Sequence, residues 1–158
     1  MQAGGLDLKY VLETHAHADH LSAADYIRRK TGAKVGIGAH IVEVQKTFIP
    51  LFEAGDLTAD GRAFDRLLQE GETLPLGDLI IGVVHTPGHT RGSTTWVTTV
   101  TENGQTYKIV FPDGTSVNPG YRVAKNPSYP GIADDYRRTF AVLDAIKPDI
   151  WLRPHTET

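Results

Sequence analysis

The stretch Thr14-His15-Ala16-His17-Ala18-Asp19-His20 places four side chains that can bind a metal within six residues. His15 and His17 are two positions apart, so an extended backbone directs both rings to one side. Asp19 and His20 follow where a helix is expected to begin, and there they can face a second point nearby. The pattern therefore predicts half of a metal site, and it favours a site for two metals.

Two more histidines follow predicted strands. His89 lies just beyond a predicted strand at Leu79–His85, in the turn 86–90, and His155 lies just beyond a shorter strand at Asp149–Leu152. Ligands at the carboxyl ends of strands can converge on a common edge of a sheet. We therefore expect the histidines of all three segments to meet there.

The number of ligands fits two metals. Three neutral imidazoles, from His15, His17 and His89, leave the open fourth position that a catalytic zinc needs. The second set consists of Asp19, His20 and His155. The remaining histidines, His40 and His85, lie outside these motifs, and we expect structural roles for them.

Composition narrows the class of protein. The 158 residues suit one domain, and a net charge of -3 without a basic run gives nucleic-acid binding little support. No run of apolar residues is long enough to span a membrane. The sequence has no cysteine, so any metal must be bound by histidine and carboxylate. Residues 1–5 show no signal peptide, which predicts a cytoplasmic protein as sequenced, or a periplasmic one if an export segment precedes it.

The first forty residues predict a β-α-β unit. Strands are expected at Leu8–Leu12 and Ala33–Ala39, with a helix at Leu21–Lys30 between them. Asp19 lies near the expected N-cap of that helix, and Thr31-Gly32 supplies its end. Such a unit favours parallel pairing and an α/β fold.

Beyond residue 49, the sequence predicts one irregular segment, a hairpin and a helix. Six prolines and glycines predict an irregular segment with a helical turn or two over residues 50–78. Asn103-Gly104 predicts a hairpin between strands at Thr94–Val100 and Thr106–Phe111. A long loop over residues 112–131 leads to the best helical pattern of the chain, at Ile132–Lys147.

The residues now described resemble a known family. His-Ala-His-Ala-Asp-His at 15–20, followed by Thr-Pro-Gly-His-Thr at 86–90, is similar to the metallo-β-lactamase superfamily, and the match covers nearly the whole chain. The resemblance implies an αββα sandwich with the metal site at one edge of the sheets. Residues 1–158 would form a single domain of this type that lacks the N-terminal strands and the C-terminal helix of the family.

The two halves resemble different branches of that superfamily. Residues 7–90 look like the persulfide dioxygenases and glyoxalase II, through the segment 13–24 and Phe64-Asp65-Arg66-Leu67. Residues 89–155 look like the lactamases whose metal ligands are histidine and aspartate without cysteine. We therefore interpret the chain as a chimera of two relatives, or as a fragment. A homo-oligomer would cover the incomplete sheet.

The loop after the hairpin holds three further candidates. Asp113 aligns with a metal-binding Asp of the dioxygenases, but an Asp before Gly114 is equally typical of a turn. Lactamases of the histidine-ligand subclass use a loop serine to hold the drug carboxylate. Thr115 or Ser116 would take that substrate-binding role here.

Three hypotheses follow. The first is a hydrolase with two Zn²⁺ ions, which lower the pKa of a shared water so that hydroxide attacks a carbonyl of a small-molecule substrate. Asp19 would hold the second metal and orient the hydroxide, and a β-lactam is favoured over a thioester because the loop 112–131 lies in the lactamase-like half. The second is a persulfide dioxygenase with one Fe²⁺ held by His15, His89 and Asp113. The third is an inactive fragment.

Overall fold

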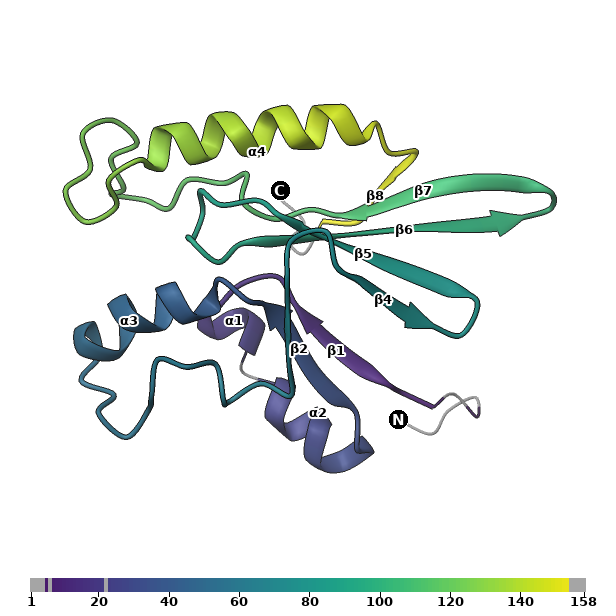
Figure 1. The fold of residues 1–158 in the computed structure, drawn as a ribbon, viewed down its shortest axis with the longest axis horizontal. Helices are drawn as coiled ribbons and strands as arrows, with labels where there is room; N and C mark the ends of the chain where they lie inside the picture. Colours follow the sequence, from purple (N-terminus) through teal and green to yellow (C-terminus); the bar gives the residue numbers. More distant parts are fainter. Residues whose placement is uncertain (1–4, 6, 22, 154–158) are drawn as a thin grey trace.

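Two β-sheets lie face to face between helices in the computed structural model, which describes residues 5, 7–21 and 23–153. In Figure 1, helix α4 (Ile132–Ile146) covers the outer face of the five-stranded sheet. Helices α1 (Ala18–Leu21), α2 (Ala24–Thr31) and α3 (Ile41–Leu51) lie on the opposite side, along the three-stranded sheet. The order of layers is therefore helix, sheet, sheet, helix, and the predicted αββα sandwich is confirmed.

The three-stranded sheet is parallel throughout. Its order is β1 (Tyr10–Glu13), β2 (Lys34–Gly38) and β3 (Arg66–Leu68). The predicted β-α-β unit is confirmed, but its helix is divided into α1 and α2. Asp19, which was expected near the N-cap of a single helix, lies in the first turn of α1, and the N-cap residue of α2 is Ala23. Gly32 ends α2 as predicted, in the left-handed conformation at φ 76°, where its N–H donates to the carbonyl of Arg28.

The five-stranded sheet is antiparallel except at one edge. It runs β4 (Thr73–Leu76), β5 (Leu79–His85), β6 (Thr94–Glu102), β7 (Gln105–Phe111) and β8 (Ile150–Trp151), and only β8 pairs in parallel. Asn103 and Gly104 both adopt positive φ between β6 and β7, as a tight hairpin turn requires, so the predicted hairpin is confirmed. The predictions of β5, β8 and α4 are confirmed as well.

Residues 50–78 differ from the prediction of an irregular segment. They contain β3 and β4, and α3 extends into them. Asp65 anchors this region, because its carboxylate accepts the N–H of Val35 at 2.8 Å and its own N–H donates to the carbonyl of Val35 at 2.9 Å. Pro75 is compatible with β4, since β4 is the edge strand of its sheet.

The two sheets approach each other closely beside the histidine motif. The N–H of Thr94 donates to the carbonyl of Thr14 at 2.9 Å, which ties β6 to the end of β1. A Cβ on Gly38 would meet Oγ1 of Thr94 at 1.9 Å, so only glycine permits this approach. Between the sheets, a buried cluster consists of Leu68, Leu74, Val83 and Trp96.

A second core lies under α3. Ile37 of β2 is fully buried, and it packs with Ile41 and Val44 of α3. Burial of a side chain such as Ile37 contributes about 1.5–3 kcal/mol to stability. This core fixes α3 beside the loop that carries His17.

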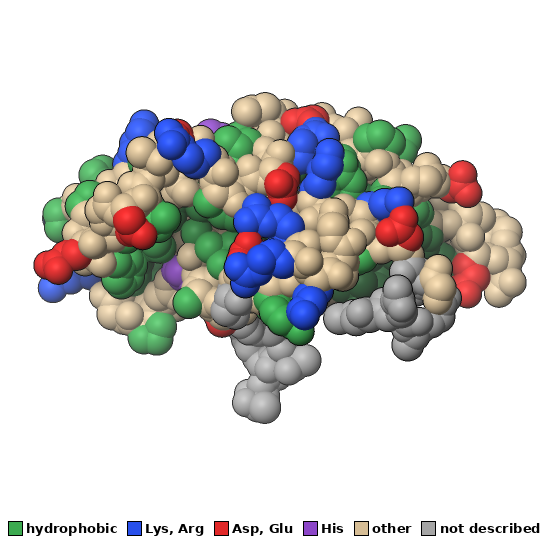
Figure 2. All heavy atoms as spheres, turned by 90° about the horizontal axis from the view of Figure 1, so that it is seen from below, with side chains coloured by type: hydrophobic (Ala, Val, Ile, Leu, Met, Phe, Trp, Pro, Cys, Tyr) green, Lys and Arg blue, Asp and Glu red, His purple; other side chains and the backbone are tan. Residues whose placement is uncertain are grey.

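The surface carries charges of both signs. On the face seen in Figure 2, acidic and basic side chains are interspersed, and the ion pairs of Asp25 with Arg28 and Arg29 belong to α2. Among the described residues, no helix is long and apolar enough to cross a membrane.

Candidate metal centre

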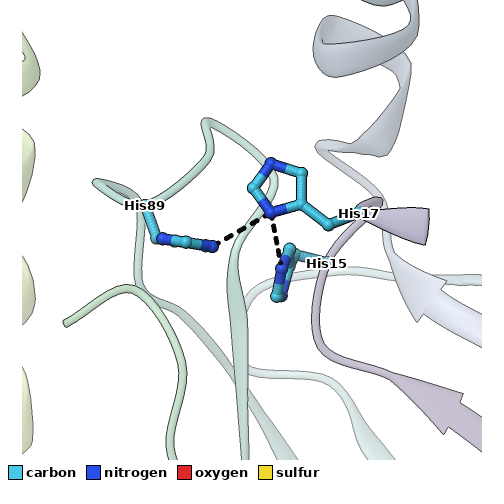
Figure 3. A group of neighbouring side chains, drawn as sticks. All are labelled: His15, His17 and His89. Carbon is cyan, nitrogen blue, oxygen red and sulfur yellow. Dashed lines mark hydrogen bonds between the residues drawn. The ribbon is translucent and has the colours of Figure 1, made fainter. Parts of the chain in front are cut away.

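Three histidines from distant parts of the chain meet at one edge of the sandwich. His15 and His17 follow β1, and His89 lies in the loop between β5 and β6. Their rings point toward one another (Figure 3), and one nitrogen of each lies within 4.8 Å of the others. The prediction that the ends of separate strands would bring these histidines together agrees with this arrangement.

The spacing of the inward nitrogens suits a metal ion. Nδ1 of His17 lies 3.1 Å from Nε2 of His15 and 3.1 Å from Nε2 of His89 (Figure 3). Three nitrogens at the usual zinc–nitrogen distance of about 2.0–2.1 Å in tetrahedral geometry are separated by roughly 3.3 Å. Two of the three separations therefore suit ligands of one zinc ion, and the third pair, Nε2 of His15 and Nε2 of His89, lies within 4.8 Å.

The outward nitrogens of two rings are held by the protein. Nδ1 of His89 lies 3.0 Å from the carbonyl oxygen of Ser116, to which it donates, and 3.1 Å from Oγ of the same residue. Nδ1 of His15 faces the carboxylate of Asp113 at 3.0 Å and the hydroxyl of Thr14 at 3.1 Å. With the proton on Nδ1, opposite these acceptors, the Nε2 of each ring presents a lone pair to the centre.

The surroundings of His17 and His89 favour the neutral form of each ring, which is the form that binds a metal cation. Burial, with smaller contributions from the nearby rings of His15 and His89, lowers the pKa of His17 to about 4. Burial also lowers the pKa of His89, with a smaller effect from His15. Both rings are therefore neutral at pH 7 and can serve as ligands. Burial alone would raise the pKa of Asp113, but His15, together with the N–H of Gly114 and with His89, outweighs burial and holds that pKa below its usual value.

Asp113 fits both roles considered for it from the sequence: it lies beside the histidine cluster, and it also forms part of a turn. It is 7% exposed and precedes Gly114, which turns at φ 85°. A Cβ on Gly114 would meet the carbonyl oxygen of Thr86 at 1.9 Å, so the turn packs against the loop that carries His89. The carboxylate faces Nδ1 of His15, on the far side of the ring from the three inward nitrogens. Its position is that of a partner to a ligand.

Asp19 and His20 lie beside the three histidines, on α1. The ring of His20 is 3.9 Å from that of His15 between centroids, and its Nε2 is 3.6 Å from Oδ2 of Asp19. The side chain of Asp19 is 59% exposed, and its charge raises the pKa values of His17 and His89. Neither residue belongs to the group of three nitrogens within the described part of the chain. His155 lies outside the described residues.

The two hydroxyl residues proposed to bind substrate have different surroundings. Ser116 holds His89, as described, and its carbonyl also accepts the hydroxyl of Tyr136 at 2.7 Å. Thr115 lines a separate cavity with Phe140 and Trp151.

His40 and His85 lie apart from the centre. Their rings stack with centroids 3.8 Å apart and an angle of 5° between planes. Nε2 of His85 donates to the carbonyl of Arg91 at 2.8 Å. The pair thus joins the start of α3 to the loop of His89.

A pocket of about 430 Å³ opens at His89. Its walls are α3 and the loop of residues 120–129, and its apolar side chains include Val44, Phe48 and Leu51. These pocket residues are not among the candidates predicted from the sequence. The signal was present, since they recur at i, i+4 and i+7, which is the spacing of one helix face.

Comparisons with known proteins agree with this geometry. The family model of the metallo-beta-lactamase superfamily matches residues 1–99. A probable metallo-hydrolase of Burkholderia pseudomallei is 51% identical over 96 residues, which are 60% of this chain and 33% of that protein. Glyoxylase B2 of Dictyostelium discoideum is 41% identical over 87 residues, 54% of this chain and 30% of its own. The chain thus spans about a third of the length of these curated relatives.

Solved structures match over more of the chain. The class B3 di-zinc metallo-beta-lactamase LRA-12 from an Alaskan soil metagenome is 32% identical, with a TM-score of 0.73. That match covers 93% of this chain and 57% of the lactamase. The predicted resemblance to the metallo-β-lactamase superfamily is confirmed, with relatives named as a glyoxylase and as a class B3 metallo-beta-lactamase.

Proposed function

The chain belongs to the metallo-beta-lactamase superfamily, and from this premise we propose that it forms the active site of a dizinc hydrolase that cleaves a β-lactam. The observation that carries the proposal is the convergence of His15, His17 and His89, with inward nitrogens about as far apart as one zinc requires. The pocket that opens at His89 provides the space for a substrate.

The residues divide into two sets of ligands. His15, His17 and His89 would hold the first zinc, and Asp19 and His20, next to them, would hold the second together with His155. Two zinc ions supply a water that ionises near neutral pH and a positive charge beside the substrate carbonyl. The similarity to a lactamase that is named di-zinc supports the second metal.

The protein's own groups position this chemistry. The carbonyl of Ser116 and the carboxylate of Asp113 fix the rings of His89 and His15, so that the inward nitrogens need not reorient when the metal arrives. Asp19 is exposed beside the cluster, and its carboxylate can accept a proton from the attacking water and hold that water in line with the carbonyl.

A thioester is the second candidate substrate. Its support is the similarity to a protein named glyoxylase B2. The iron hypothesis has less support. Asp113 faces Nδ1 of His15, whereas the nitrogen of His15 that faces His17 is Nε2. One imidazole cannot direct both of its nitrogens at a single ion, so His15, His89 and Asp113 do not form the required facial triad.

Hydrolysis by matched variants tests the proposal. We expect the zinc-loaded chain to open a chromogenic cephalosporin, and His89→Ala to reduce the rate to that of buffer, because one of three ligands is lost. Glu102→Ala, at the exposed hairpin end of β6, is the control. Cleavage of an S-acyl glutathione instead of the cephalosporin would select the thioester. Equal rates in wild type and His89→Ala would refute a hydrolase at this centre.

A further inference from the structure

The carbonyl oxygen of Ser116 accepts two hydrogen bonds from different elements. Nδ1 of His89, in the loop between β5 and β6, donates to it at 3.0 Å, and the hydroxyl of Tyr136, on α4, donates to it at 2.7 Å. A carbonyl oxygen has two lone pairs, so it can accept both bonds. A single shared acceptor therefore connects Tyr136 to the ring of His89.

Few other contacts fix the position of this acceptor. Ser116 lies in the irregular segment between β7 and α4, and no backbone N–H of the described residues donates to its carbonyl. Without the hydroxyl of Tyr136, the carbonyl would be bonded only to His89, and it could move together with that ring. Tyr136 is therefore the donor that holds the acceptor in place independently of His89.

Packing fixes the ring of Tyr136 itself. The residue is 6% exposed and belongs to a buried cluster with Tyr129 and Ile132. A Cβ on Gly88 would meet Cδ1 and Cε1 of this ring at 2.8 Å, so the ring lies directly against the backbone of the residue before His89. Because a tyrosine side chain has only two χ angles, a packed ring gives its hydroxyl a defined position.

Helix α4 also contacts the loop of His89 at a second point. Thr139 lies three residues after Tyr136, on the same face of α4, and it is fully buried. Its hydroxyl donates to the carbonyl of Pro87 at 2.6 Å. One face of α4 thus holds both the loop that carries His89 and the carbonyl of Ser116 to which His89 donates.

The hydroxyl of Tyr136 keeps its proton at neutral pH. Burial raises the pKa of Tyr136 to about 12, with smaller contributions from the charge of Asp113 and from Tyr121. The group is therefore available as a donor, and the carbonyl of Ser116, which can only accept, is a suitable partner.

We propose that Tyr136 is a positioning residue of the metal centre, which acts through the carbonyl of Ser116 to hold His89 in the tautomer with its proton on Nδ1. The hydrogen bond made by one ring nitrogen decides which nitrogen keeps its lone pair. Nε2 of His89 lies 3.1 Å from Nδ1 of His17, so this tautomer directs the lone pair at the centre. The inference rests on the proposed function only in taking His89 as a metal ligand.

Removal of one hydroxyl from each of two similar tyrosines tests the inference. Tyr136→Phe loses the donor to Ser116. Tyr129→Phe is the matched control, because its ring is equally buried in the same cluster and its hydroxyl donates to Asp135 at 2.8 Å. Both variants of the full chain keep the aromatic ring, and urea unfolding checks that both remain folded.

The first readout needs no metal. Nitrogen-15 NMR of the histidine rings in the metal-free protein at neutral pH reports the tautomer of His89, whose signals are assigned by their absence in His89→Gln. We expect the Nδ1–H tautomer in wild type and in Tyr129→Phe, and a mixture of both tautomers in Tyr136→Phe, since the acceptor is then no longer fixed.

The second readout is zinc affinity, measured by competition with a chromophoric chelator. We expect it to fall about fivefold in Tyr136→Phe and to stay unchanged in Tyr129→Phe. The loss is smaller than the roughly 10–100-fold effect of removing a direct partner of a ligand, because the carbonyl of Ser116 remains.

Two outcomes would overturn the inference. One is a single Nδ1–H tautomer with wild-type zinc affinity in Tyr136→Phe, since the carbonyl would then be held without the hydroxyl. The other is an equal loss of zinc affinity in both variants, which would come from loosened packing of the cluster. A change of tautomer and affinity confined to Tyr136→Phe, in a chain that hydrolyses no substrate, would support the inference while the proposed function fails.

Discussion

At the residue scale, metal binding depends on which nitrogen of each histidine faces inward. His15 and His89 present Nε2 and His17 presents Nδ1. The sequence could predict that these residues meet, because H-x-H spacing and strand ends are local signals. It could not predict their tautomers, since Ser116 and Asp113 lie far along the chain and are brought to the rings only by folding.

Removal of the charge behind His15 should weaken metal binding. Asp113→Asn keeps the size of the side chain but loses the carboxylate that fixes the Nδ1 proton of His15. We expect zinc affinity, measured by competition with a chromophoric chelator, to fall about 10–100-fold. Asp134→Asn, on the exposed start of α4, is the control and should bind zinc as wild type does. Unchanged affinity in Asp113→Asn would show that the contact has no role in the centre.

At the element scale, the site depends on two contacts between elements. The first is the close approach of β2 and β6 at Gly38 and Thr94. The second is the stacked pair of His40 and His85, which connects α3 to the loop of His89. Helix α3 and strands β3 and β4 were hard to predict for related reasons. Strand β3 has only three residues and is held by pairing with β2, and Pro75 is tolerated because β4 has an edge position. Such contacts are not local, so sequence patterns do not reveal them.

A methyl group at Gly38, where β2 approaches β6, should destabilise the fold. Gly38→Ala forces Cβ against Oγ1 of Thr94, so the sheets must separate beside the hydrogen bond from Thr94 to Thr14. We expect a loss of about 1–3 kcal/mol in the free energy of unfolding, measured with urea. Gly55→Ala, where a Cβ would meet nothing within 4 Å, should be neutral. Equal stability of the two variants would contradict the close approach.

The stacked pair of His40 and His85 should make the free energy of unfolding depend on pH. Burial lowers the pKa of His85 and outweighs the hydrogen bond to the Arg91 carbonyl, which raises it. Smaller effects come from His40 and Arg138, which lower the pKa, and from Glu70, which raises it. The unfolded chain has an ordinary histidine pKa near 6.5 and takes up the proton first as pH falls. Stability contributed by neutral His85 is therefore present above about pH 6.5 and is lost as pH falls below it.

His85→Gln, which retains a donor for the carbonyl of Arg91, isolates this effect. Between pH 7.5 and 5.5, wild type should lose about 1 kcal/mol more unfolding free energy than the variant. Urea unfolding in the presence of chelator makes the comparison, since His17 and His89 then contribute equally to both proteins. A wild type that gains stability over this range relative to His85→Gln would contradict the burial of a neutral ring.

At the scale of the whole molecule, the sandwich brings His15, His17 and His89 together beyond the ends of two strands, β1 and β5. The layer order could be predicted because the H-x-H-x-D-H motif and the second histidine segment identified the superfamily. The pocket could not, since its walls come from α3 and from the loop 120–129, which meet only in three dimensions. The predictions of a chimera and of a homo-oligomer stay predictions.

Metal content per chain tests the central claim most directly. The protein would be purified without chelator, supplied with zinc, freed of excess ion and analysed for its elements. The arrangement of His15, His17 and His89, with Asp19 and His20 beside them, predicts about two zinc ions per folded chain. A folded chain that retains no zinc would contradict the account, because its ligands would then be close in space without forming a site.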